Sequence, residues 1–146
     1  MATHEPEIIQ PVDLCTPDGR RLNPAAKGWA RQVLHTANLK GRWGRTKKWD
    51  YWAVLAGDWT VAVVYADVDY LGIAEVWWCH LPTGRTGGHA ANIPGARGIT
   101  LPDLAGTDPL RYRAAKIEVA LTDDADGTTL VAWWKEDDGT RSSLNA

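Results

Sequence analysis

The sequence contains no phenylalanine among its 146 residues. Nine Trp and four Tyr supply all of the large aromatic rings. Each ring therefore carries an N–H or O–H group that needs a hydrogen-bond partner or water when it is buried. We expect several of these rings to lie at a rim or to line a cavity. The length and the 45% apolar composition predict a single domain with one core.

Long apolar runs are absent as well. No stretch approaches the roughly 20 residues that a membrane-spanning helix needs, and no basic start followed by an apolar segment marks a secretory signal. The two cysteines, Cys15 and Cys79, are expected to be free thiols, because a disulfide is uncommon in a chain without an export signal. These absences predict a soluble cytoplasmic protein.

No complete catalytic, metal-binding or nucleotide-binding motif occurs, so we expect neither a metal nor a cofactor. If Gly84 and Arg85 form a two-residue loop, His80 lies opposite His89 and makes a partial metal site. Cys79 then points to the opposite face of the strand, so a third ligand is not secured. Ordinary rim histidines are the favoured interpretation.

Acidic residues are missing from one long stretch. Residues 19–49 contain nine basic side chains and no acid, whereas residues 50–146 contain seven bases and fourteen acids. We expect the basic stretch to pair within the fold, with Arg42, Arg45 and Lys47 reaching acids of the later strands. An external anionic partner is the alternative.

Residues 1–37 are punctuated by proline and predict an irregular arm, in which Asn23-Pro24 begins a short helix. Residues 38–146 predict a β-meander. The expected strands span residues 49–55, 59–67, 70–80, 89–93, 113–121, 128–135 and 140–144. Within residues 113–121, apolar and charged side chains alternate as in a half-exposed strand. A meander closes into a barrel or pairs with another sheet, and the short last strand leaves an edge open to self-association.

Several motifs resemble the N-terminal part of the domain of unknown function 2804 family. They are Pro11-Val12-Asp13-Leu14-Cys15, Pro17-Asp18-Gly19-Arg20, Leu22-Asn23-Pro24-Ala25-Ala26, Gly28-Trp29, the run from Asn38 to Trp52, Asp69-Tyr70 and the segment from Ala96 to Pro102. The resemblance implies a lipocalin-like β-barrel, complete or incomplete, distantly similar to carotenoid hydratases and tocopherol cyclases. It also implies a longer family of two β units, of which this chain matches the first. It supplies no catalytic residues.

Three acidic residues are weak catalytic candidates. Asp67 and Asp69 flank a strand end, and carboxylates in an apolar cavity acquire raised pKa values suited to acid–base chemistry. Paired strand-end carboxylates more often accept hydrogen bonds from Arg or from backbone amides. Glu75 is expected to face solvent, and it becomes a candidate general acid only if it points inward with Trp77.

The segment from Asn38 to Trp52 interleaves five cations with four aromatic rings. It has three interpretations, ranked in this order: a structural lead-in to the first strand, the mouth of a ligand cavity in which Arg or Lys holds an anionic end, and a nucleic-acid platform. The candidate ligand-binding residues are Arg42, Trp43, Trp49, Trp52, Tyr65, Tyr70 and Trp77.

The function favoured by these observations is binding of an apolar or amphipathic small molecule in a β-barrel cavity. The alternative is a cofactor-independent lyase or cyclase acting on an isoprenoid-like substrate, by analogy with the related group. Anion or nucleic-acid binding is the third hypothesis, and the net charge of −2 argues against a nucleic-acid partner.

Overall fold

The computed structural model describes residues 4–146 and is all-β, with ten strands and one 3-10 helix in that range. The N-terminal arm, taken as residues 4–47 up to the start of the first long strand, carries β1 (Val12–Asp13), η1 (Pro24–Ala26) and β2 (His35–Thr36). The other strands are β3 (Lys48–Ala56), β4 (Trp59–Asp67), β5 (Leu71–His80), β6 (Arg85–Pro94), β7 (Leu110–Ala114), β8 (Ile117–Asp124), β9 (Gly127–Lys135) and β10 (Arg141–Asn145). The predicted all-β antiparallel meander with a short helix in its arm is confirmed.

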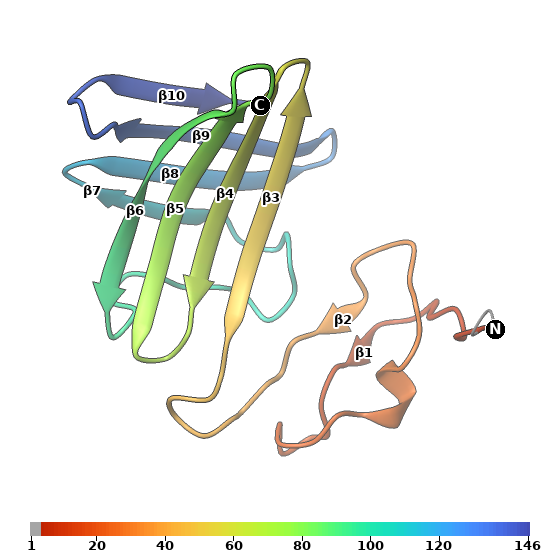
Figure 1. The fold of residues 1–146 in the computed structure, drawn as a ribbon. Helices are drawn as coiled ribbons and strands as arrows, with labels where there is room; N and C mark the ends of the chain where they lie inside the picture. Colours follow the sequence, from red (N-terminus) through yellow and green to blue (C-terminus); the bar gives the residue numbers. More distant parts are fainter. Residues whose placement is uncertain (1–3) are drawn as a thin grey trace.

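Two four-stranded sheets form the body of the molecule. Sheet A has the order β3-β4-β5-β6 and sheet B the order β10-β9-β8-β7. The strands of sheet A run across those of sheet B, which lies behind it in Figure 1. No strand pairing joins the two sheets within residues 4–146, so they form an open, incomplete barrel rather than a closed one.

The core lies between the two sheets, because alternate residues of each strand point inward. Sheet A contributes Val63, Tyr65 and Val76, and sheet B contributes Ile117 and Val119, all nearly inaccessible to solvent. The connection between β6 and β7 adds buried side chains at one end of this core. The two sheets therefore share one core.

The β7–β8 hairpin differs from the sequence prediction of one strand over residues 113–121. Ala114 faces Ile117 across the hairpin, so the two residues between them form a tight turn. Neither has a positive φ, and neither is the Gly or Asn that marks hairpin turns in a sequence. The Lys135 N–H instead donates to the Lys116 carbonyl at 2.9 Å and holds the turn against β9.

In the β5–β6 hairpin, the prediction that His80 lies opposite His89 is wrong. His80 pairs with Arg85, not with His89, because the loop between the strands has four residues. The His80 carbonyl accepts from the Gly84 N–H at 2.9 Å, and Gly84 takes a φ of +66° that an L side chain disfavours. β6 consequently begins well before the predicted segment of residues 89–93.

The N-terminal arm lies to one side of the two sheets in Figure 1. The predicted helix starts as expected, with the Asn23 side chain accepting from the Ala25 N–H at 3.1 Å. The Ala37 N–H donates to the Asp103 carbonyl at 2.6 Å and ties the arm to the β6–β7 connection. Cys15, which is buried in the arm, and Cys79 are both free thiols, as predicted.

The outer face of sheet A is unusually apolar. Trp49, Tyr51, Leu55 and Trp77 are all exposed there.

Strand β10 lies at an edge of sheet B. Self-association through this edge remains a prediction. Among residues 4–146, no helix has both the length and the apolar character needed to cross a membrane.

Candidate functional site

The two candidate aspartates near the end of β4 do lie together. Asp67 and Asp69 line one hollow of about 260 Å³. The Asp69 carboxylate accepts from the backbone N–H groups of Gly44 and Thr46, at 2.7 and 3.0 Å, while Asp67 accepts from the Asp69 N–H at 2.8 Å. Asp69 thus anchors the turn that carries Arg42, as strand-end carboxylates commonly do.

Other candidates occupy separate places. Glu75 lies half-buried on the outer face of sheet A, the face that also carries Trp49 and Trp77. Tyr65 lies in the core with 1% of its surface exposed. Its hydroxyl donates to the Arg111 carbonyl at 3.2 Å and accepts from the Thr100 N–H at 3.1 Å, and burial raises its pKa. Its contacts are structural.

The exposed candidates do not form one cavity mouth. Trp43 is 79% exposed on the turn of the arm, and Tyr70 is exposed at the β4–β5 turn. Arg42 lines a hollow on the arm, while Trp52 faces inward from edge strand β3 and is partly exposed. The structure therefore distributes the predicted ligand-binding residues over several surfaces.

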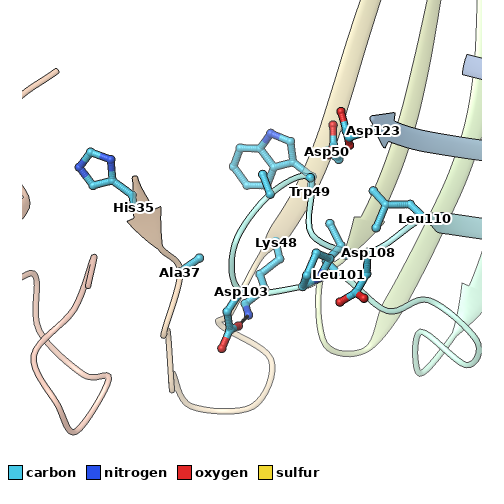
Figure 2. A pocket seen from close by; sticks show the side chains of 13 residues that line it. His35, Ala37, Lys48, Trp49, Asp50, Leu101, Asp103, Asp108, Leu110 and Asp123 are labelled. Atoms are coloured by element: carbon cyan, nitrogen blue, oxygen red, sulfur yellow. Dashed lines mark hydrogen bonds and ion pairs between the residues drawn. The ribbon is translucent and has the colours of Figure 1, made fainter. Parts of the chain in front are cut away.

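A hollow of about 150 Å³ lies between β3, β2 and the β6–β7 connection, and Trp49 lines part of it. Figure 2 shows Asp50 next to Asp123 in this hollow, with Lys48 paired to Asp103. Burial raises the pKa of Asp50 and the neighbouring charge of Asp123 raises it further, against smaller opposing hydrogen bonds from Trp52 and the backbone. This inward-facing acid was missed in the sequence because its strand neighbours are aromatic.

We expect Asp50→Asn to increase the free energy of unfolding at pH 7, because the folded state disfavours the ionised carboxylate. A raised folded-state pKa means that stability falls as pH rises through the window above the unfolded-state value, near 4. Asparagine removes this penalty and keeps an oxygen that can accept from Trp52. Urea unfolding at pH 3 and pH 7 measures the effect, which should vanish at pH 3.

Asp137→Asn is the matched control, because Asp137 is exposed and has no ion pair within residues 4–146. It should leave stability nearly unchanged at both pH values. An Asp50→Asn protein that is less stable than the parent at pH 7 would contradict the assignment of the raised pKa.

A further hollow, lined mainly by apolar side chains, lies between the sheets at the end where β4 begins and β5 ends. Its volume is about 300 Å³, and its walls are Trp59, Val61 and Trp78 from sheet A with Trp134, Ser142 and Ser143 from sheet B. We call it the indole cavity. The rings of Trp59 and Trp78 are 5.4 Å apart and tilted by 57°, so they form two walls of a corner. Trp59 is 46% exposed and Trp134 only 3%.

One carboxylate holds three walls of the indole cavity. Glu136 Oε1 accepts from the indole N–H groups of Trp78 and Trp134, at 2.8 and 2.7 Å, and from the Ser142 hydroxyl at 2.9 Å. Its Oε2 accepts from the Gly88 N–H at 2.9 Å. Desolvation opposes ionisation of Glu136, but these hydrogen bonds together outweigh it and lower its pKa. Glu136 therefore links the β9–β10 turn to β5 and β6 across the two sheets.

Two glycines of β6 make this arrangement possible. A Cβ atom on Gly87 would come within 2.6 Å of the Trp78 ring, so the ring lies directly over the bare backbone. Gly88 has a φ of +137°, and a Cβ there would meet the Val76 carbonyl oxygen at 2.1 Å. This backbone conformation turns the Gly88 N–H toward Glu136.

The residues of the indole cavity were missed in the sequence. The weak signals for them were the absence of Phe, which gives every ring a polar edge, and the adjacent Gly87-Gly88 pair within a strand. Neither signal says that Trp78 and Trp134, far apart in the chain, share the Glu136 carboxylate. Among residues 4–146, no group of three or more His, Cys, Asp or Glu side chains is placed to hold a metal.

The expected internal pairing of the basic stretch is wrong for most of its members. Lys27, Arg31 and Lys48 pair with Glu5, Glu7 and Asp103. Within the described part of the chain, no carboxylate oxygen lies within 4.0 Å of the side-chain nitrogens of the other six basic residues, including Arg42, Arg45 and Lys47. The acids of the later strands lie on the body, whereas most of these cations lie on the arm.

The chain was compared with protein families, with curated proteins and with solved structures, and the family comparison agrees with the motifs noted in the sequence. No curated protein and no solved structure matches the chain. A family model does match it, over residues 5–145, and its description is "Domain of unknown function (DUF2804)". This match confirms the resemblance carried by the arm and by the run from Asn38 to Trp52. With nearly all of its residues matched, the chain belongs to the DUF2804 family.

Proposed function

We propose that this protein binds an apolar or amphipathic small molecule in the indole cavity. The observation that carries the proposal is that three indole rings from two sheets line one hollow of about 300 Å³, a volume at the lower end of known ligand sites. The rings of Trp78 and Trp134 are held in place by Glu136. Little conformational entropy is then lost when a ligand packs against them.

The charge around the cavity favours a ligand whose polar end is neutral or cationic. Glu136 is ionised at neutral pH because its hydrogen bonds lower its pKa. Its negative charge lies directly behind the walls formed by Trp78 and Trp134. Donation of the indole N–H groups to this anion enriches the ring faces in electron density, which strengthens cation–π contacts. This differs from the sequence-based hypothesis of an Arg or Lys holding an anionic end.

A catalytic use of the cavity is less well supported. A lyase or cyclase would need a carboxyl group that can give up or accept a proton near neutral pH. Glu136 has a lowered pKa and accepts four hydrogen bonds, which suits it to hold the rings. Asp50 has a raised pKa but lies in a different hollow. We therefore propose binding, in the cytoplasm, in keeping with the two free thiols.

Titration with the neutral fluorescent probe N-phenyl-1-naphthylamine tests this proposal. We expect saturable binding with energy transfer from Trp, and a loss of about tenfold in affinity in Trp59→Ala, the equivalent of one lost aromatic contact. Trp43→Ala, on the arm, and Trp77→Ala, on the outer face of sheet A, are the matched controls and should bind as the parent does.

Competition with ligands of one chain length tests the charge preference. Octyltrimethylammonium and octanol should displace the probe, and octanoate should displace it least. Loss of probe binding in Trp77→Ala but not in Trp59→Ala would place the site on the outer face of sheet A and contradict the proposal. Strongest competition by octanoate would contradict the charge preference alone.

A further inference from the structure

Three basic side chains line another hollow, on the arm and away from the indole cavity. Arg20, Lys40 and Arg42, with Gly41, line a hollow of about 290 Å³. Among residues 4–146, no carboxylate oxygen lies within 4.0 Å of a side-chain nitrogen of any of the three. Three cations that share one hollow repel each other, and an anion of high charge relieves this repulsion.

The backbone brings Arg20 close to Lys40 and Arg42 although it lies far from them in the chain. The Lys40 N–H donates to the Gly19 carbonyl at 2.9 Å. Gly19 has a φ of +69°, and a Cβ atom on it would lie 2.7 Å from the Cβ of Lys40. Only glycine permits this close approach, which sets Arg20 beside Lys40. The Asp18 carboxylate accepts from the Thr16 hydroxyl and from the Arg20 backbone N–H, at 2.6 and 3.2 Å, and these bonds, with a smaller contribution from the Arg20 charge, lower its pKa.

The backbone at Arg42 is also fixed. Its carbonyl accepts from the Arg45 N–H at 3.0 Å, which closes a turn. The Asp69 carboxylate holds the far side of this turn through Gly44 and Thr46. The hollow is therefore bounded by two turns, each held by an aspartate, so the backbone that carries the three exposed cations is fixed.

We propose that Arg20, Lys40 and Arg42 form a binding site for a phosphate group. Arg presents a planar fork of N–H donors that matches two phosphate oxygens, and Lys adds a point charge. The phosphate group is supplied either as free phosphate or as a phosphate ester of a small molecule. In the second case, the exposed ring of Trp43 follows Arg42 directly and offers a stacking surface for an aromatic ester.

Calorimetric titration with inorganic phosphate and with phenyl phosphate, at constant ionic strength, tests the site. Saturable binding of at least one of them is expected, weakened about tenfold in Arg20→Gln and in Arg42→Gln through the loss of charge-assisted hydrogen bonds. Arg97→Gln is the control, because Arg97 is exposed on the β6–β7 connection. Tighter binding of phenyl phosphate that Trp43→Ala abolishes assigns an ester, and equal binding of both assigns free phosphate.

Folding of the variants is checked separately, by thermal unfolding in phosphate-free buffer. Arg42→Gln should unfold at the same or a higher temperature than the parent, because one repelling charge is removed. The proposal is overturned if neither anion binds saturably, or if Arg97→Gln weakens binding as much as Arg42→Gln does. It is also overturned if only a single-stranded oligonucleotide binds, with a steep salt dependence.

Discussion

Glu136→Ala is expected to lower the free energy of unfolding by about 3 kcal/mol. The substitution leaves the indole N–H groups of Trp78 and Trp134 without an acceptor. Each buried donor that loses its acceptor costs about 1–3 kcal/mol. The Gly88 N–H and the Ser142 hydroxyl lose their acceptor as well. Chemical denaturation at pH 7 measures the change. The loss should be large because Glu136 joins the two sheets.

Two variants separate this role from a general effect of charge. Glu136→Gln should be less destabilising than Glu136→Ala, because the amide oxygen of glutamine can replace one of the two carboxylate oxygens as an acceptor. It should still be destabilising, because the amide nitrogen of glutamine is a donor and faces an N–H group that has lost its acceptor. Glu118→Ala is the matched control: Glu118 also accepts an indole N–H, from Trp133 at 2.7 Å, but on the outer face of sheet B. It should cost less than about 1 kcal/mol, because the Glu118 side chain is 38% exposed and solvent weakens its interactions. Equal losses in the two alanine variants would contradict the inter-sheet role.

The contribution of Glu136 should also be visible in how the free energy of unfolding of the parent protein depends on pH. The pKa of Glu136 is lowered in the folded state. Its contribution is therefore complete above the unfolded-state pKa and is lost as pH falls through the folded-state pKa. The stability difference between the parent and Glu136→Gln should accordingly narrow in acid. A difference that is the same at pH 7 and in acid would show that the carboxylate charge contributes nothing.

Gly88→Ala is expected to destabilise the fold by about 3 kcal/mol or more, through a strained backbone and a steric clash. A methyl group at this position would meet the Val76 carbonyl oxygen at 2.1 Å and the Trp77 Cα at 2.9 Å. These are backbone atoms of the neighbouring strand, so relief requires the strands to separate. Separation of β5 and β6 also withdraws the Gly88 N–H from Glu136.

Gly84→Ala is the matched control for this substitution. Gly84 also has a positive φ, of +66°, but nothing lies within 4 Å of the position of its Cβ. It should cost only about 1–2 kcal/mol, the penalty of the left-handed conformation alone. Thermal unfolding of both variants measures the difference. If Gly88→Ala is no worse than Gly84→Ala, the close packing of β6 on β5 is wrong.

The strands of the body could be predicted largely from local pattern. β4 was expected over residues 59–67 and is observed over that range, because β-branched and aromatic residues end there at clear turn residues. The Ala115-Lys116 turn could not be predicted, since its position depends on a bond to β9 and not on its own residues. Local signals thus fail where a tertiary contact decides the conformation.

The candidate site could not be predicted, for a related reason. Ring positions in the indole cavity depend on Glu136, and the sequence contains nothing that pairs this residue with Trp78, 58 positions away. The charge blocks were misread because opposite charge along a chain does not ensure proximity in space. Instead, the tight turn at Gly19 brings like charges together on the arm.

The most direct test of ligand binding between the sheets is an NMR titration that follows the nine indole N–H signals while N-phenyl-1-naphthylamine is added. Each signal is assigned with a single Trp→Phe variant. We predict that Trp59, Trp78 and Trp134 shift together and saturably, while Trp43 and Trp49 do not. Shifts confined to Trp49 and Trp77, on the outer face of sheet A, would contradict a ligand site between the sheets.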